Sequence, residues 1–339
     1  MSLKQRIFYL DELRMIAILA VILCHVDSFY PYVTTSLKVA IPYFLTELGR
    51  IGVPLFLMIS GALLIGKDYD LGFFLKKRFS RILVPFIFWV IVISAYQFYV
   101  LKTNPVGVLD WALGKGVTWY VYELIGAYFM IPIINSFIKE YGDKAVKYFL
   151  ILWAVTLLIQ TFNYNPIDHF KLDYFAGFIG TMVFGHYLYT KKFNLSDGAM
   201  ILIGILLFIV FYAINCANTF YTTSSFSYHS VVPVLQAAGV FLTFRYLSEY
   251  KNNNPGSFIG KVRTKIEDGV IGKIVLSIST CSYAMYFTHT IVYMTLRKYL
   301  EVSSLKLLPV LFIVTVVLSW AIAYASSKIP YISKVCGVK

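Results

Sequence analysis

The sequence predicts an all-α, polytopic integral membrane protein with about ten transmembrane helices and with both termini in the cytoplasm. Of its 339 residues, 59% are hydrophobic and only 14% are charged, whereas a soluble domain carries about 25% charged residues. Continuous apolar runs recur along the chain, each about twenty residues long, which is the length that a helix needs to cross a bilayer. A membrane barrel would instead show alternating apolar and polar residues.

Ten membrane spans are expected. They cover residues 7–27, 51–66, 82–101, 118–136, 146–162, 173–190, 199–216, 229–247, 273–296 and 307–326.

The distribution of Lys and Arg supports this number of spans. With a cytoplasmic N-terminus, 21 of the 30 Lys and Arg residues fall in cytoplasmic segments, eight fall in external loops, and Arg14 lies inside the first span. Positive side chains gather on the cytoplasmic side of membrane proteins. The formal net charge of +13 is therefore attributed to membrane topology, and no nucleic acid partner is expected.

We expect one membrane-embedded domain over residues 1–339, without an extracellular hydrolase-like domain. The first apolar run begins at Ile7 and is followed by no small-residue cleavage site, which argues against a removed signal peptide. The cysteines Cys24, Cys216, Cys281 and Cys336 have no paired spacing. This pattern indicates neither a disulfide framework nor a zinc site, and no metal is expected.

The first span contains two ionisable residues, Arg14 and His25. Such residues are costly within a bilayer and usually mark a function. Eleven residues bring a helix to within about 20° of its starting direction and advance it by about 16 Å. Arg14 and His25 therefore share one helix face at two depths. Taken singly, Arg14 is equally explained by snorkelling toward lipid phosphate, and His25 by an interfacial histidine; the pair on one face favours function.

Polar residues near Arg14 set the expected direction of this helix. Asp11 is predicted to be the N-cap, with its carboxylate accepting from backbone N–H groups of the first turn. Arg14 would then lie at the cytoplasmic mouth, and His25 beyond the bilayer midplane.

The next two spans add small and basic residues. Ser60 and Gly61 lie in mid-span, where small residues admit either a ligand or a second helix. Arg78 and Arg81 are three residues apart and are expected in the opening turn of the next helix, beside its N-terminus. Two guanidiniums there suit a phosphate, although positive-inside anchoring would explain them equally well.

Three arginines at the cytoplasmic mouth and a histidine about 16 Å further out fit a ligand with phosphates at one end and a reactive group on a long arm. Coenzyme A has this shape, because its nucleotide carries the phosphates and its pantetheine arm ends in the thioester. His25 would serve as a general base on an acceptor hydroxyl, or would accept the acyl group itself.

These residues carry a resemblance to the membrane acyltransferase-3 family, most closely to the branch that contains the enterobacterial common antigen O-acetyltransferase. The first-span signature is Arg, ten residues, then His, here Arg14 to His25. The other matching motifs are VPLFLMISG (53–61), RFSRILVP (78–85), TWYVYELIGAYFMIP (118–132) and SYAMYFTH (282–289). They follow the family's order over most of the chain.

The resemblance implies transfer of an acyl group, most commonly acetyl, from cytoplasmic acyl-CoA to a hydroxyl of a cell-surface or lipid-linked carbohydrate. Carried over, His25 would be the base or acyl acceptor, His289 a second site histidine, and Arg14, Arg78 and Arg81 would bind the CoA phosphates. Ser60, which lies in the segment that matches the family's VPLFFMISG motif, is also a cofactor-binding candidate. The expected location is the plasma (inner) membrane, with membrane lipids around the chain and possible homo-oligomers.

The sequence departs from the family at two positions. Met15 replaces the glycine that usually follows the first-span arginine, and Glu123 stands where the compared branch is apolar. Glu123 is a candidate general acid or base, or a neutral, hydrogen-bonded side chain. A second class of function also fits: a carrier that exports a polyprenol-linked sugar or polysaccharide precursor, with the arginines holding its phosphates. Only the transferase requires His25.

Overall fold

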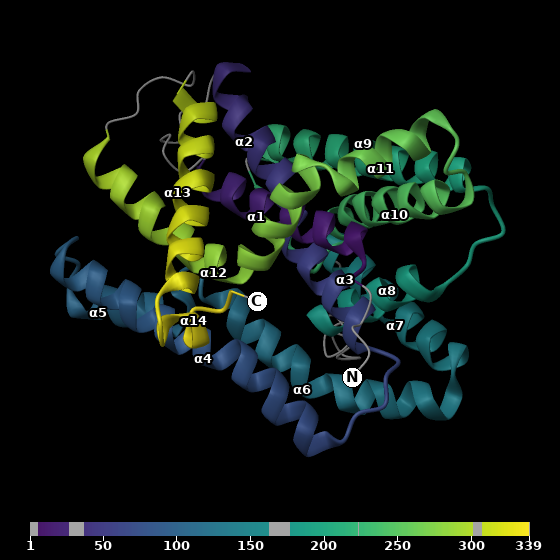
Figure 1. The fold of residues 1–339 in the computed structure, drawn as a ribbon, viewed down its shortest axis with the longest axis horizontal. Helices are drawn as coiled ribbons and strands as arrows, with labels where there is room; N and C mark the ends of the chain where they lie inside the picture. The colour runs from purple at the N-terminus through teal and green to yellow at the C-terminus, as the bar shows by residue number, and fades with distance from the viewer. Residues whose placement is uncertain (1–5, 27–36, 163–176, 223, 301–306, 339) are drawn as a thin grey trace. The chain divides into compact units, whose positions relative to one another are not determined.

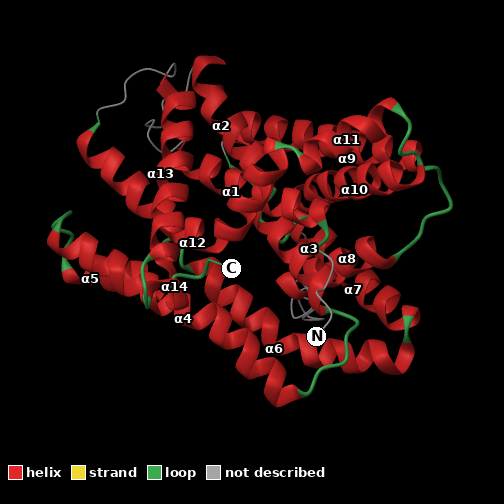
Figure 2. Ribbon diagram, viewed as in Figure 1, coloured by secondary structure: helices red, strands yellow, loops and turns green. Residues whose placement is uncertain are grey.

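The computed structural model describes residues 6–26, 37–162, 177–222, 224–300 and 307–338. Helices account for almost all of this part of the chain, and no strand occurs in it (Figure 2). The expected all-α, polytopic membrane class is confirmed.

The helices are labelled in Figure 1. Their bounds are α1 Phe8–Val26, α2 Leu37–Gly49, α3 Gly52–Leu64, α4 Leu71–Tyr99, α5 Pro105–Asp110, η2 Trp111–Lys115, α6 Trp119–Tyr141, α7 Asp143–Phe162, α8 Phe178–Thr190, α9 Asp197–Thr222, α10 Val231–Asn253, α11 Phe258–Asp268, α12 Val270–Tyr299, α13 Leu308–Lys328 and α14 Ile332–Val335.

Eight helical segments of the described chain are long and apolar enough to cross a membrane. Two of the ten expected spans are not among them. The first, α1, is 19 residues long but contains Asp11, Glu12 and Arg14 within its first two turns. The second, α8, has 13 residues, and the beginning of that expected span, 173–176, lies outside the described residues.

The helix that carries the arginine pair begins much earlier than its predicted span. Its membrane span was expected at residues 82–101 and its opening turn at Arg78 and Arg81, but α4 starts at Leu71 and runs for 29 residues. The carboxylate of Asp70 caps it by accepting from the backbone N–H of Phe73 at 2.8 Å. The helix start was predicted too late because it was placed within the basic segment, whereas the capping residue lies before that segment.

The chain divides into two compact units. Unit 1 comprises Met1–Ala17, Arg50–Ile65 and Val146–Thr280, and unit 2 comprises Ile18–Gly49, Gly66–Ala145 and Cys281–Lys339. The first half of α1 and the start of α12 thus belong to unit 1, while the remainder of both helices belongs to unit 2. Each unit is described separately below.

In unit 1, α3 and α8 approach each other through glycines. A Cβ added to Gly61 would overlap the backbone of Met182, and one added to Gly185 would overlap the backbone of Met58. Absence of a side chain at both positions lets the two helix backbones touch, as small residues do between membrane helices. Helix packing therefore accounts for Gly61, one of the two explanations that the sequence left open.

We expect Gly61→Ala to destabilise unit 1, because the added methyl group meets backbone atoms that cannot rotate away. Overpacking of this kind costs about 1–3 kcal/mol. Thermal unfolding in detergent measures the effect. Gly126→Ala is the matched control, since nothing lies within 4 Å of a Cβ at that helical glycine, and it should leave the midpoint unchanged or raise it slightly. Equal midpoints for both variants would contradict the close packing of α3 on α8.

In unit 2, two hydrogen bonds hold α4 beside α12. The Tyr283 hydroxyl donates to the backbone carbonyl of Ile82 at 2.9 Å. Further along both helices, the hydroxyls of Tyr96 and Thr295 lie 2.5 Å apart. Because both contacts advance in the same direction along the chain, the two helices run parallel. The segment of α4 that follows the arginine pair is thus fixed against the segment of α12 that precedes His289.

Candidate functional site

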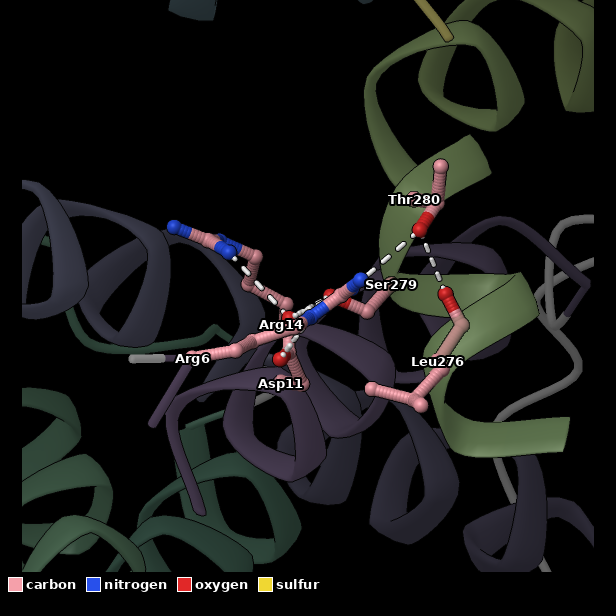
Figure 3. Close-up of polar contacts among 6 residues, drawn as sticks. All are labelled: Arg6, Asp11, Arg14, Leu276, Ser279 and Thr280. Atoms are coloured by element: carbon pink, nitrogen blue, oxygen red, sulfur yellow. Dashed lines mark hydrogen bonds and ion pairs between the residues drawn. The ribbon is translucent and has the colours of Figure 1, made fainter. Parts of the chain in front are cut away.

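Asp11 is the centre of a polar cluster in unit 1 (Figure 3). It is 1% exposed, and its carboxylate accepts from the guanidinium of Arg6 at 2.6 and 3.1 Å. It also accepts from Arg14 Nη1 at 3.3 Å and from the Ser279 hydroxyl at 2.6 Å. Arg6 Nη2 further donates to the Thr280 hydroxyl at 3.2 Å. This cluster fixes the N-terminal half of α1 against the beginning of α12.

The prediction that Asp11 is the N-cap of the first helix is wrong. Helix α1 begins at Phe8, so Asp11 lies inside the first turn and its side chain is turned toward α12. Two guanidiniums and a hydroxyl donate to this buried carboxylate, and hydrogen bonds between two ionised groups are among the strong ones. The hydrogen bond from Arg6 in turn raises the pKa of that guanidinium above its usual value.

Arg14 is therefore part of an ion pair as well as a candidate ligand for a phosphate. A third of its side chain, 33%, stays exposed, whereas that of Asp11 is 2% exposed. The single Asp11 carboxylate lies between two guanidiniums, those of Arg6 and Arg14, so these three side chains keep a net charge of +1. Neither this pairing nor the contact with Ser279, which comes from a helix 268 residues away in the chain, was predicted from the sequence.

The residue next to Asp11 forms a second buried ion pair in unit 1. Arg263 of α11 donates to both carboxylate oxygens of Glu12, at 2.6 and 2.7 Å. The two side chains are only 9% and 5% exposed. Bidentate geometry of this kind gives the strongest guanidinium–carboxylate contact. Two consecutive carboxylates of α1 thus hold two different segments of the later chain.

The two predicted histidines are neighbours in unit 2. The ring centroids of His25 and His289 lie 5.0 Å apart at an angle of 58°. Each Nδ1 contacts the backbone carbonyl one turn earlier in its own helix, Val21 for His25 at 2.7 Å and Met285 for His289 at 3.1 Å. A carbonyl oxygen only accepts hydrogen bonds, so both Nδ1 atoms carry the proton and each Nε2 presents its lone pair.

The histidine pair lies in a buried environment. His289 is 1% exposed, and its Nε2 has no hydrogen-bond partner among the described residues. Buried polar atoms without a partner are rare and demand a reason, a catalytic role among them. Tyr286 and Tyr293 flank the pair, with centroids 6.0 Å from His289 and 6.5 Å from His25 respectively. These tyrosines were not singled out from the sequence, although Tyr286 lies within the SYAMYFTH motif.

The arginine pair also belongs to unit 2. Arg78 is half-buried and Arg81 exposed, and within the described residues neither guanidinium takes part in a hydrogen bond or an ion pair. They lie seven and ten residues after the start of α4 at Leu71, or about 10–15 Å along the helix. The expectation that they sit in the opening turn is wrong. The helix dipole, which acts within the first turn, does not assist them.

The arginines and the histidines are connected through α12. Ile82, the residue after Arg81, accepts the hydrogen bond of Tyr283. His289 follows Tyr283 by six residues, which is about 9 Å along the helix. Along α4 and α12, unit 2 therefore has first the two arginines, then the segment in which the two helices are hydrogen-bonded to each other, and then the two imidazoles.

Two other predicted residues are described each within its own unit. Glu123 lies on α6 in unit 2 and is exposed; in the described structure its carboxylate has neither a hydrogen bond nor an ion pair. Ser60 lies on α3 in unit 1 and is half-buried. No group of three His, Cys, Asp or Glu residues in the described ranges could hold a metal ion.

Comparison with known proteins gives one match. A family model described as an acyltransferase domain, that of the acyltransferase-3 family, matches residues 7–324. No curated protein and no solved structure matches the chain. The match covers α1 through most of α13 and so includes every candidate site residue. The match supports the family as a whole and not its enterobacterial common antigen branch in particular.

Proposed function

Because this chain belongs to the acyltransferase-3 family and is an acyltransferase of the membrane, we propose that it transfers an acyl group, acetyl foremost, from cytoplasmic acyl-CoA to a hydroxyl of a cell-surface or lipid-linked carbohydrate. The observation that carries the proposal is the pair formed by His25 and His289 in unit 2, with ring centroids 5.0 Å apart. A transfer to a hydroxyl needs a base, and neutral imidazole is the commonest one.

In the proposed reaction, the Nε2 atom of His25 takes the proton of the acceptor hydroxyl. The hydroxyl oxygen then forms a bond to the thioester carbonyl carbon, the bond from that carbon to sulfur breaks, and the CoA thiolate leaves and receives the proton from the imidazolium. In the two-step form of the same transfer, His25 Nε2 bonds to the thioester carbonyl carbon and the carbon–sulfur bond breaks, which releases the CoA thiolate. The acceptor oxygen then bonds to that carbon, the bond from carbon to Nε2 breaks, and the hydroxyl proton passes to the thiolate. His289 packs against His25 and acts as the second site histidine.

The phosphates of the donor are assigned to the arginines. Arg78 and Arg81 are unpaired within the described part of the chain, and guanidinium groups bind phosphate through two parallel hydrogen bonds. Arg14 stays a candidate for the same role, because it lies eleven residues before His25 on the continuous helix α1.

We expect Arg81→Lys to weaken acetyl-CoA binding about tenfold, although the charge is conserved, because a lysine cannot make the bidentate contact. Isothermal titration of the purified protein measures the dissociation constant. Lys76→Arg is the matched control: it exchanges the same two side chains in the opposite sense at an exposed position of α4, and binding should stay unchanged. Equal affinity of Arg81→Lys and the wild type would contradict this role.

The remaining parts of the proposal go beyond what membership of the family implies. Glu123 is retained as a candidate general acid or base and Ser60 as a candidate cofactor contact. The plasma (inner) membrane is the proposed location, the enterobacterial common antigen branch the proposed relationship, and homo-oligomers the proposed assembly.

One experiment decides between the transferase and the exporter of a lipid-linked sugar. Surface glycans from cells with the wild-type protein, the His25→Ala variant or no protein are compared by mass spectrometry, and binding of labelled acetyl-CoA is measured in parallel. A transferase leaves the glycan in place but without its acyl ester in the variant. Normal glycan acylation by His25→Ala together with no binding of acetyl-CoA would reject the proposed function and favour the exporter.

A further inference from the structure

A cavity of about 520 Å³ lies in unit 2 between the beginning of α4 and the end of α6. Its α4 wall consists of Leu71, Phe74 and Leu75, and its α6 wall includes Phe129 and Ser136. By the Lys and Arg distribution, this end of both helices faces the cytoplasm. None of the residues that line the cavity has a role in the acyl-transfer reaction proposed above.

Hydrogen bonds hold the segment that closes the cavity in place. The side-chain amide of Asn135 accepts from the backbone N–H of Gly66 at 2.9 Å and donates to the carbonyl of Lys67 at 3.1 Å. Lys139 forms an ion pair with Asp68 at 2.9 Å, and both side chains are largely exposed. Exposed ion pairs are weak, so an anionic ligand can take the place of Asp68 beside Lys139. The cavity is thus formed in advance and has a cationic rim.

The cavity and the arginine pair share one face of α4. Arg78 follows Leu71 by seven residues and Arg81 follows Phe74 by seven, and seven residues bring a helix to within about 20° of its starting direction. Both guanidiniums therefore lie on the stripe that forms the cavity wall, about 4–10 Å beyond it along the helix. Neither is paired in the described structure.

The order of chemical groups along this stripe fits one part of acyl-CoA. Three aromatic residues line the cavity: Phe74 is 2% exposed and packs on Tyr69, whereas Phe129 is 56% exposed. An exposed aromatic ring such as that of Phe129 can stack on a nucleic base. Two unpaired guanidiniums follow, then the contact of Ile82 with Tyr283 that leads along α12 to His289. A base, then phosphates, then a thin arm toward the reacting atom is the order in the donor itself.

We propose that this cavity binds the adenosine nucleotide end of the acyl-CoA donor, with the phosphates on Arg78 and Arg81 and the arm extending along α4 and α12. The inference rests on the proposed function, since it names the donor's binding position. It makes Lys139, Phe129 and Ser136 determinants of donor affinity, and it explains why the unpaired cations of α4 lie well inside the helix.

The test fills the cavity in the full-length protein. Ser136→Trp places an indole in it, and Ser80→Trp is the matched control. Both serines are exposed and bond to a carbonyl of their own helix, but Ser80 lies about 180° from Leu71 on α4. We expect Ser136→Trp to raise the KM for acetyl-CoA at least tenfold, and to leave the KM for acetyl-pantetheine, which lacks the nucleotide, unchanged. Ser80→Trp should change neither. If Ser136→Trp does not fold, Leu71→Trp serves in its place, because Leu71 is 56% exposed.

Competition identifies the ligand. Adenosine 3′,5′-bisphosphate should displace labelled acetyl-CoA from the wild type and bind at least tenfold more weakly to the cavity-filled variant. Unchanged binding by that variant, or displacement by phosphatidylglycerol micelles but not by the bisphosphate, would overturn the inference while leaving acyl transfer intact; the second result would assign the cavity to a lipid headgroup. A wild type that binds no acetyl-CoA would instead overturn the proposed function and this inference together.

Discussion

Replacing His25 with alanine is expected to lower the rate of acyl transfer by about 10²–10⁴-fold, the range that a positioned general base contributes. The imidazole is oriented by the hydrogen bond from its Nδ1 to the carbonyl of Val21, so Nε2 is the atom that we propose meets the acceptor hydroxyl. Alanine retains the helix and removes only the base. The affinity for acetyl-CoA should stay close to that of the wild type, because His25 makes no contact with the phosphates in the proposed reaction.

Transfer of labelled acetyl from CoA to a glycan acceptor measures this rate in purified protein. Cys24→Ala is the control for local disturbance of α1: it changes the adjacent residue, whose thiol donates to the carbonyl of Thr46 at 3.4 Å, and it should keep wild-type activity. The double variant of His25 and His289 tests whether the histidines act as a unit. Their combined loss should then be far smaller than the product of the single losses. Full activity of His25→Ala would remove it from the chemistry.

Breaking the buried pair of Glu12 and Arg263 is expected to have the largest effect on stability. Truncating one partner leaves an uncompensated buried charge, which costs about 3–5 kcal/mol. Both Glu12→Leu and Arg263→Met should therefore lower the unfolding midpoint strongly, or abolish accumulation of folded protein. The double variant should recover much of the loss, since an apolar pair of similar volume often replaces a buried ion pair without penalty.

Thermal unfolding of the detergent-solubilised protein, followed by size-exclusion chromatography, compares these variants. The exposed pair of Lys139 and Asp68, with side chains 69% and 79% exposed, provides the control. Asp68→Asn removes an ion pair of the same type but should cost no more than about 1 kcal/mol. If the single variants at Glu12 and Arg263 were as stable as Asp68→Asn, the two charges would not be buried together in the folded protein.

Hydropathy was sufficient to predict the fold class and most of the membrane helices, because burial in lipid imposes a long apolar run on each of them. It also predicted the first helix, but it contained no signal for how the three charges in the first two turns of that helix are compensated. Glu12 pairs with Arg263 of α11, whereas Asp11 pairs with Arg6 and Arg14 and also accepts from the Ser279 hydroxyl of α12. Arg263 illustrates the difficulty: by sequence it counts among the cytoplasmic charges, while in the structure it is buried on Glu12.

The candidate site was predicted in part. The resemblance named both His25 and His289, but only the packing of α1 on α12 brings their rings together in unit 2. The periodicity correctly placed Arg78 and Arg81 on one helix face and incorrectly placed them at the helix start, since the cap at Asp70 lies outside the apolar run. Tyr293 and the cavity between α4 and α6 depend on tertiary contacts, for which a single sequence contains no signal.

The ion pairs of α1 have a consequence for biosynthesis. Glu12 pairs with Arg263, which lies 251 residues later in the chain, and Asp11 accepts from the Ser279 hydroxyl, 268 residues later. At about 5–20 residues per second, these partners leave the ribosome roughly 10–50 s after the first helix. During that interval the carboxylate of Glu12 lacks its counter-ion. A helix in this condition is expected to remain at the translocon or with an insertion chaperone until α11 and α12 emerge. The first helix to be synthesised is then among the last to be completed.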